Sequence, residues 1–322
     1  MSELHKFLFE GLPVRGMLVR LTDSWREVLR RRETVGVHPP ELRALLGEMS
    51  AAVVLMQANI KFNGAVILQV SGDGPVKLAV AEAQPDLSFR ATAKLVGEVP
   101  AGAQLEAMLN VHGQGRCAIT LDPKDKFPGQ QPYQGVVPLH GDQREPLQKL
   151  SEVLEHYMLQ SEQLDTRMVL FANDEIAAGL LIQRLPVSGA GNLGGSGEAA
   201  RNEDEIGLSD AFNRISILAS TLTADELLGL DAQTILRRLF WEETVRCFEP
   251  LEPKFACSCS RERVGNMLKA LGREEVDSIL AERGDVEIGC EFCGLQYHFD
   301  PVDAGALFTV DMALPGGSGT VQ

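Results

Sequence analysis

The first part of the chain alternates between stretches with helical spacing and stretches with strand spacing of apolar residues. Residues 41–60 are long, apolar and Ala-rich, which predicts a buried helix, and residues 22–32 predict a shorter helix entered through a polar cap. Short runs rich in β-branched residues predict strands, and the first two runs flank Ser-Gly-Asp-Gly-Pro as in a hairpin. The strands are expected near residues 65–70, 76–80, 87–92 and 115–121.

A third amphipathic stretch, residues 145–160, predicts a helix that packs on a sheet. Helices interleaved with strands and hairpins indicate an α+β domain that ends near Pro186. We assign residues 1–187 to this N-terminal core domain. The apolar stripe of the third helix contains Leu147, Leu150, Val153, Leu154, Tyr157 and Met158.

Residues 188–204 are rich first in Gly and Ser and then in acidic residues, which predicts a flexible insert. The insert contains a G-x-G-x-x-G pattern from Gly189 to Gly194. A dinucleotide site needs a helix directly after such a loop, and here more Gly, Ser and acidic residues follow. We therefore give this pattern little weight as a nucleotide site.

The pattern after the insert becomes strongly helical. Residues 209–222 form one candidate helix, and Thr223 with Glu226 forms a capping box. Asp231 can cap a further helix at residues 232–246, before two prolines. We expect residues 205–254 to be a helical linker. Two readings stay open: the linker packs simply on the first domain, or it packs only while the C-terminal segment is folded.

Four of the six cysteines lie in two close pairs, Cys257-x-Cys259 and Cys290-x2-Cys293. Zinc prefers soft thiolate ligands in a tetrahedron, and pairs that are close in sequence supply them with little loop entropy. The stretch between the pairs contains a predicted helix at residues 273–282 that Gly284 closes. Random placement rarely gives two such pairs, so residues 255–322 are predicted to form a small zinc-binding domain.

Four thiolates would leave zinc no open position, which disfavours a hydrolase. His298 could replace one thiolate, but we expect it in a strand beside the site. Thiolates are also the form that oxidants attack. Cys290 and Cys293 can close a disulfide readily, and Cys257 and Cys259 can do so in a tight ring. Oxidation would eject the metal from a segment with little core, so the site is able to act as a switch, although most such sites are structural.

The composition is ordinary for a globular protein, with 44% apolar and 23% charged residues, but the net charge is −15. That charge opposes binding to nucleic acids and to anionic membranes. The chain shows neither a secretion signal nor a long apolar span, so we expect a cytoplasmic protein. The sequence has no G-x-S-x-G or H-E-x-x-H motif, and we expect no enzyme activity. Cys117 and Cys247 are interpreted as small apolar core residues.

Two other functions remain as alternatives. A zinc-ribbon module could bind nucleic acid, but residues 251–301 carry six Lys/Arg against ten Asp/Glu. A thiol–disulfide oxidoreductase could use Cys290 and Cys293, but the βαβ context of a thioredoxin-like site is missing.

Several runs of the sequence have the pattern of a known family. In the first part they are "LQVSGDGPV", "ITLDP", "YQGVVPL" and "SEQLDTR", and later "FNRISILASTLTADELLGLDAQTILRRLFWEE", "VRCFEP", "FACSCSRERV", "ML..LG.EEV" and "CEFCG..YHFD". These runs closely resemble the redox-regulated heat-shock protein 33 family, the 33-kDa chaperonins. The resemblance covers nearly the whole chain, and the cysteine set in its helical context is highly specific. Three departures are the Gly-rich insert, the lone cysteines, and a tail longer than expected after Asp300.

The resemblance implies an ATP-independent holdase that binds unfolding proteins under oxidative stress. Cys257, Cys259, Cys290 and Cys293 would bind one Zn²⁺ in the reduced, inactive state. Oxidation would form the Cys257–Cys259 and Cys290–Cys293 disulfides, release zinc, and unfold the C-terminal domain and linker. The active form would be a homodimer, the reduced form a monomer, and clients would pass to ATP-dependent foldases. The fold expected is α+β, with a large N-terminal domain of mixed sheet and helix, a helical linker and a small zinc-binding domain.

Overall fold

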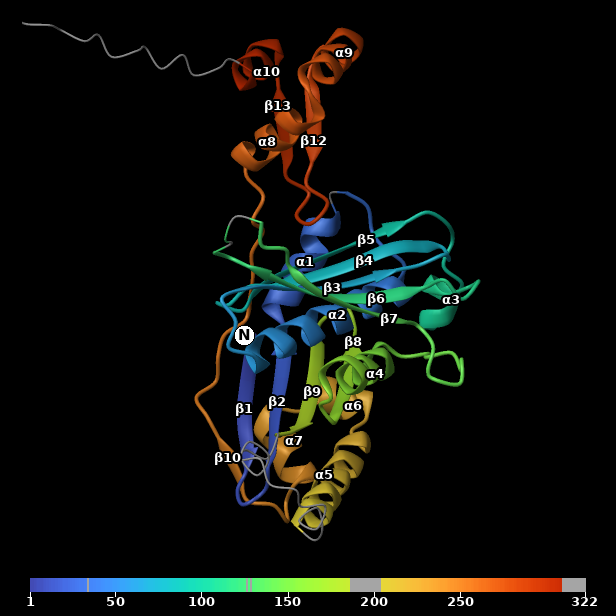
Figure 1. Cartoon of the computed structure of the whole chain (residues 1–322), viewed down its shortest axis with the longest axis vertical. Coiled ribbons are helices and arrows are strands. Elements are labelled where there is room, and N and C mark those ends of the chain that lie inside the picture. Colours follow the sequence, from blue (N-terminus) through green and yellow to red (C-terminus); the bar gives the residue numbers. More distant parts are fainter. Residues whose placement is uncertain (34, 126, 128, 186–203, 309–322) are drawn as a thin grey trace, which may run out of the picture. The chain divides into compact units, whose positions relative to one another are not determined.

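The computed structural model describes residues 1–33, 35–125, 127, 129–185 and 204–308 (Figure 1). The chain divides into two compact units, Met1–Ala256 and Cys257–Gln322, which are treated separately below. Most of the predicted insert, with its G-x-G-x-x-G pattern, lies outside the described residues, as does the end of the tail. The assignment of the chain to four domains therefore stays a prediction.

The first unit contains two sheets. One has five strands, all paired antiparallel. Its order is β10 (Val245–Cys247), β1 (Glu3–Phe9), β2 (Val14–Leu21), β9 (Ala177–Arg184) and β8 (Thr166–Ala172).

The other sheet has six strands and contains all four strands predicted in the first part of the chain. The predicted hairpin is confirmed, because β3 and β4 are antiparallel neighbours. Only the edge strand β11 pairs parallel to its neighbour. The order is β11 (Lys254–Phe255), β5 (Ser88–Leu95), β4 (Val76–Ala83), β3 (Gly64–Ser71), β6 (Arg116–Pro123) and β7 (Tyr133–Pro138).

The predicted helix at residues 41–60 is confirmed as α2 (Pro40–Asn59), and it lies between the two sheets (Figure 1). It is buried on nearly all sides, which explains why its sequence is apolar throughout rather than amphipathic. Ser50 Oγ donates to the Leu46 carbonyl oxygen, so this buried hydroxyl is satisfied within the helix. The shorter predicted helix is confirmed as α1 (Asp23–Glu33), and a helix of five residues, α3 (Leu105–Leu109), was not predicted.

The third predicted helix begins later than the periodicity suggested, because α4 spans Leu150–Glu162. The Glu152 carboxylate accepts hydrogen bonds from the backbone N–H groups of Gln148 and Lys149, which fixes the helix start. Leu147 donates its backbone N–H to Leu139 and packs on the core from a non-helical segment. The predicted apolar residues therefore do pack on the core, but the first of them, Leu147, lies in a loop before the helix.

Three helices cover the face of the five-stranded sheet that does not contact α2. They are α5 (Asp204–Ser220), α6 (Ala224–Gly229) and α7 (Ala232–Leu239), called the linker helices below. The predicted caps are confirmed, because Thr223 Oγ1 accepts from Glu226 and Asp231 accepts from Thr234. A second apolar core joins helices and strands. Its buried residues are Phe7, Phe9, Val14, Leu18, Ile176, Ala178, Leu180, Ile182, Phe212, Ile215, Ala219, Leu222, Leu227, Ala232, Ile235, Leu236, Leu239 and Phe240.

The helix predicted at residues 232–246 is too long by seven residues, because α7 ends at Leu239. Phe240 packs its ring against Phe9 and Phe7, with ring centroids 4.9 and 6.3 Å away. The chain then forms β10, which pairs with the edge of β1. This pairing satisfies backbone N–H and C=O groups of β1 that would otherwise lie at the edge of the sheet. Residues 245–247 therefore form a strand, although the local pattern favoured a helix.

Within residues 257–308, the second unit has three helices and a two-stranded antiparallel sheet around a small core. The predicted helix at residues 273–282 is confirmed, and Gly284 closes it in the left-handed region at φ +86°. The mixed α+β class with a small C-terminal cysteine unit is confirmed. The elements are α8 (Arg261–Leu271), α9 (Arg273–Arg283), β12 (Val286–Gly289), β13 (Gln296–Phe299) and α10 (Pro301–Leu307).

Candidate metal centre

Each cysteine pair lies on irregular backbone beside a regular element of the second unit. Cys257 and Cys259 precede α8, whose first turn is capped by Ser260 Oγ accepting from the Arg263 N–H. Cys290 and Cys293 lie in the turn that joins β12 to β13. Two backbone hydrogen bonds close this turn, from Gly294 to the Cys290 carbonyl at 2.8 Å and from Cys290 to the Leu295 carbonyl at 2.9 Å. Each short turn therefore brings its two sulfurs close together.

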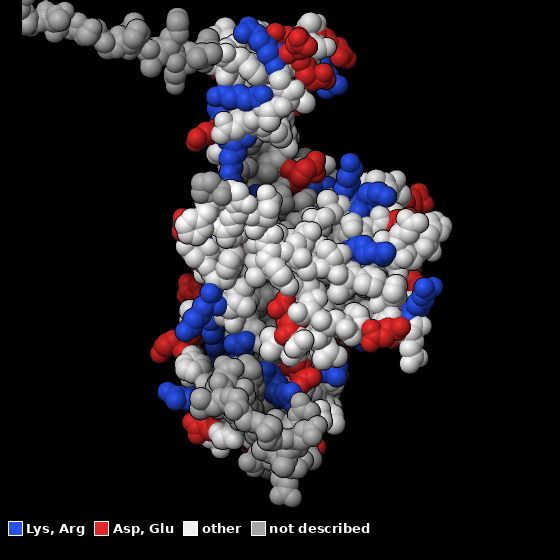
Figure 2. Space-filling view, viewed as in Figure 1, with Lys and Arg blue, Asp and Glu red and all other residues white. Residues whose placement is uncertain are grey.

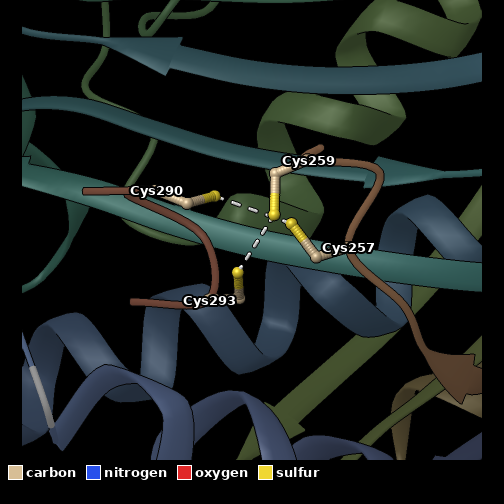
Figure 3. A group of neighbouring side chains, drawn as sticks. All are labelled: Cys257, Cys259, Cys290 and Cys293. Carbon is tan, nitrogen blue, oxygen red and sulfur yellow. Dashed lines mark hydrogen bonds between the residues drawn. The ribbon is translucent and has the colours of Figure 1, made fainter. Parts of the chain in front are cut away.

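The four sulfur atoms point toward one another and lie within 4.8 Å of one another (Figure 3). Two contacts join the two pairs: the sulfurs of Cys257 and Cys290 lie 3.6 Å apart, and those of Cys259 and Cys293 lie 3.4 Å apart. A tetrahedral zinc site with Zn–S distances of about 2.3 Å needs sulfur separations of roughly 3.8 Å. The arrangement fits one zinc ion, and it is the only such cluster of ligand-type side chains within the described part of the chain.

The surroundings of the sulfurs disfavour the charged thiolate form in the absence of a cation. Burial raises the pKa of the Cys290 and Cys293 thiols, and the pKa of Cys290 is raised further by nearby Cys257. A divalent metal reverses this effect, because it stabilises the thiolate form of its ligands. The hydrogen bond between Tyr297 and Cys259, followed by burial, raises the pKa of the Tyr297 hydroxyl. Four soft sulfur donors match the ligand preference of zinc.

His298 lies in β13, as expected, and outside the sulfur cluster. Its side chain is 58% exposed, and its ring nitrogens lie 3.6 Å from Asp285 and 3.7 Å from Glu287. The geometry therefore supports a set of four sulfurs rather than three sulfurs and an imidazole.

The two lone cysteines differ from each other. Cys117 is a fully buried core residue on β6, as predicted, and burial raises its pKa to about 12. The same prediction was wrong for Cys247, which is exposed on the edge strand β10. Its exposure follows from the unpredicted strand, which directs this side chain away from the core.

Sequence reasoning missed Arg261, which joins three elements next to the cysteines. Its guanidinium lies 4.2 Å from the centroid of the Phe299 ring, donates to the His298 carbonyl at 2.7 Å and bonds Asp303 at 2.6 Å. A single arginine at a helix start carries no periodic signal, so only the fold reveals this role.

The surface offers no support for a nucleic-acid function on the face that Figure 2 shows. Basic and acidic side chains are scattered there among wide areas of uncharged residues, with no continuous basic tract among the residues coloured. Among the described residues, none of the helices is both long enough and apolar enough to span a membrane.

Comparison with known proteins gives a consistent result. The sequence profile of a family described as "Hsp33 protein" matches residues 2–300. A curated relative named 33 kDa chaperonin from Chromobacterium violaceum is 48% identical over 312 residues, covering 97% of this chain and 95% of the relative. A second, from Methylobacillus flagellatus, is 45% identical over 316 residues, covering 98% and 97%.

A solved structure shares the fold. The crystal structure of the 33 kDa chaperonin (heat shock protein 33 homolog) from Thermotoga maritima superposes with a TM-score of 0.73 at 21% identity, covering 95% of this chain and 98% of that one. The sequence resemblance is thereby confirmed by a profile that spans both the N-terminal sheets and the cysteine unit. The chain belongs to the Hsp33 protein family.

Proposed function

We propose that this protein is a redox-regulated, ATP-independent chaperone that binds unfolding proteins under oxidative stress in the cytoplasm. Membership of a chaperonin family supports the chaperone function. The observation that carries the redox part is the cluster of four free thiols within 4.8 Å, set in a unit with a small core. Family relatives are named chaperonins, and we propose no catalytic activity.

In the reduced state, Cys257, Cys259, Cys290 and Cys293 would hold one Zn²⁺. The ion would supply a fixed centre that joins the start of α8 to the turn between β12 and β13. The two parts are 30 residues apart in sequence, and the thiolates would cross-link them. Tyr297, which interacts with Cys259, would help to orient the sulfur.

Oxidation would remove this ligand set. In each pair, two thiols lose two electrons and two protons and form one S–S bond. Hypochlorous acid would accept the electrons and become chloride and water. We propose the pairs Cys257–Cys259 and Cys290–Cys293, because their members are neighbours in sequence. A disulfide sulfur is a poor zinc ligand, so the ion would be lost with the thiolates.

Unfolding of the second unit would follow from the size of its core. Among the described residues of the second unit, six buried apolar side chains form that core, so loss of the metal cross-link would remove a large part of the stabilisation. The core residues are Leu268, Val276, Val286, Tyr297, Phe299 and Ala304.

The linker helices would supply the surface that binds clients. Their inner faces and the strands beneath them form a continuous apolar core in the first unit. If the linker helices detach after the second unit unfolds, both faces become available to non-native chains. We propose that the active form is a homodimer, that the reduced form is a monomer, and that clients pass later to ATP-dependent foldases.

The test is a titration of reduced, zinc-loaded protein with hypochlorous acid. Zinc release is followed with a metallochromic dye, and aggregation of an unfolding test protein is measured in the same samples. We expect release and protection to rise together and both to reverse on thiol reduction with added zinc. The Cys293→Ser variant should bind zinc weakly, whereas Cys247→Ser, the same substitution at an exposed cysteine outside the cluster, should behave as the parent.

Zinc release without protection of the client would contradict the proposal and leave the cluster as a structural clamp. Turnover of a dithiol substrate would instead favour a thiol–disulfide oxidoreductase.

A further inference from the structure

A pocket of about 360 Å³ lies in the first unit between α1, the start of α2 and β5. This volume is in the range of small-molecule sites. The pocket is lined entirely by residues of the N-terminal unit, and none of the six cysteines contributes to it. The cysteine chemistry proposed above therefore makes no use of it.

One side of the pocket is apolar and rigid. Trp25 is fully buried, and its indole N–H donates to the Asn173 carbonyl at 2.7 Å, which fixes the ring. Val28 and Leu46 are buried beside it, and Leu29 completes this side. Such a surface suits a flat or aliphatic group of a ligand rather than an ion alone.

Another part of the pocket lining is basic. Four arginines contribute to it, although the net charge of the chain is −15. Two acidic residues, Glu33 and Asp174, also line the pocket, so the lining itself carries more positive than negative groups. Outside the lining, Asp23 and Glu175 pair with Arg26 and Glu27 pairs with Arg30, which leaves Arg32 and Arg43 as the cations nearest His38. The four arginines are Arg26, Arg30, Arg32 and Arg43.

Several of these guanidinium groups already have acidic partners. Arg43 bonds both oxygens of Asp174, at 2.7 and 2.8 Å, and also donates to the His38 carbonyl. Arg30 bonds Glu27 through two nitrogens, both at 2.7 Å. Arg32 donates to the Gly36 carbonyl at 3.1 Å. These contacts hold the arginines in place around the pocket, so a ligand would find donors that are already ordered.

His38 supplies an independent indication of a ligand. It lines the pocket and is only 5% exposed, yet its Nε2 atom has no hydrogen-bond partner among the described residues. Buried polar atoms are normally paired, so an orphaned one at a pocket marks a place where a polar group is expected. Burial, followed by the charges of Arg32 and Arg43, lowers the pKa of His38 to about 4. The neutral ring can donate one hydrogen bond to an anion.

We propose that this pocket binds a small organic anion, with its apolar body against Leu29 and Val37 and its carboxylate or phosphate group near His38, Arg32 and Arg43. The site goes beyond the chaperone function proposed above and does not depend on the redox state of the cysteines. The chemical class follows from the pairing of an apolar wall with ordered cationic donors.

The probe is phenyl phosphate, which combines an aromatic ring with an anionic group. Isothermal titration calorimetry on the reduced, zinc-loaded protein should give saturable binding, with weaker binding of inorganic phosphate and of uncharged benzyl alcohol. The Arg32→Gln variant should weaken binding by about tenfold, because one charge-assisted hydrogen bond is lost. Arg31→Gln removes the same charge from the neighbouring position of α1, which does not line the pocket, and should leave binding unchanged.

A second variant separates binding from folding. His38→Phe keeps an aromatic ring but removes the orphaned nitrogen, so it should weaken phenyl phosphate binding without lowering the melting temperature. Nuclear magnetic resonance signals of the His38 ring should shift on titration of the parent protein. Absence of saturable heat up to about 10 mM probe would overturn the proposal. Equal binding by Arg32→Gln and the parent, or equal affinity for inorganic phosphate, would overturn it as well.

Discussion

Cys117 and Cys247 are chemically identical side chains with opposite surroundings. Cys117 is fully buried, and its pKa is raised to about 12, so almost no thiolate exists near neutral pH. Cys247 is exposed on β10. We expect iodoacetamide to label Cys247 and not Cys117 in the native, zinc-loaded protein, as read by peptide mass spectrometry. Labelling of both in denaturant is the control, and native labelling of Cys117 would contradict the burial.

The candidate ligands could be found in the sequence because their signal is local. Two close pairs of cysteines are visible without a fold, and short turns keep the members of each pair together. The exposure of Cys247 and the contacts of Arg261 could not be found in this way. Both depend on contacts between parts that are far apart in the chain: β10 pairs with β1, and Arg261 contacts His298 and Asp303, which lie 37 and 42 residues later.

Phe240 and Trp241 are neighbours that contribute very differently to the docking of the linker helices. Phe240 is buried between the helices and β1, whereas Trp241 is 75% exposed. Phe240→Ala should lower the free energy of unfolding of the first unit by roughly 3–5 kcal/mol. Trp241→Ala should change it by less than about 0.5 kcal/mol. Urea unfolding followed by circular dichroism measures both values.

The same pair of variants tests the proposed role of the linker helices. If detachment of these helices exposes the client-binding surface, Phe240→Ala should suppress client aggregation even when reduced and zinc-loaded. Trp241→Ala should stay inactive until oxidised. An inactive reduced Phe240→Ala protein that retains its fold would argue against a client surface beneath the helices.

The capping box of α6 is expected to contribute less to the free energy of unfolding than the burial of Phe240 does. Thr223→Ala removes the oxygen that accepts the Glu226 N–H, and we expect a loss of about 1 kcal/mol. Gln233→Ala, at an exposed position within α7, is the control and should be close to neutral. Equal unfolding midpoints for the two variants would show that the cap does not stabilise the linker.

Helix boundaries that depend on caps were predictable, and those that depend on distant pairing were not. Thr223, Asp231 and Gly284 act on backbone groups within a few residues, so the sequence alone located them. The end of α7 is decided elsewhere, because residues 245–247 pair with the edge of β1. The start of α4 is an exception among the caps: Glu152 sets it through the backbone N–H groups of Gln148 and Lys149, but the apolar periodicity extended past this cap and hid it.

The two units should respond differently to metal removal. The first unit has two extensive apolar cores, whereas the core cluster in the described part of the second unit has six buried residues. We expect a zinc chelator, added to reduced protein, to raise amide hydrogen exchange throughout residues 257–308 while β1–β9 keep their protection. Re-addition of zinc should restore the slow exchange. Unchanged exchange in the second unit after verified metal loss would show that its fold does not need the ion.

The mixed α+β class and the small cysteine unit were predictable from pattern and composition, but the arrangement of the first unit was not. Residues 40–59 could be identified as a buried helix, yet nothing in a single sequence states that two sheets enclose it. The parallel pairing of Lys254–Phe255 with β5 joins positions far apart in the chain. A two-residue strand has no periodicity to detect.

Strand β11 ends at Phe255, so that a single residue, Ala256, separates it from the cysteine unit. Its attachment to the sheet is modest: Phe255 packs against the core, and Lys254 bonds Asp86 at 3.0 Å on an exposed surface. Such an ion pair is weak and sensitive to salt. Under the redox mechanism proposed above, substitutions at these positions would change the oxidant threshold, because they would strengthen or loosen this attachment while every sulfur stays in place.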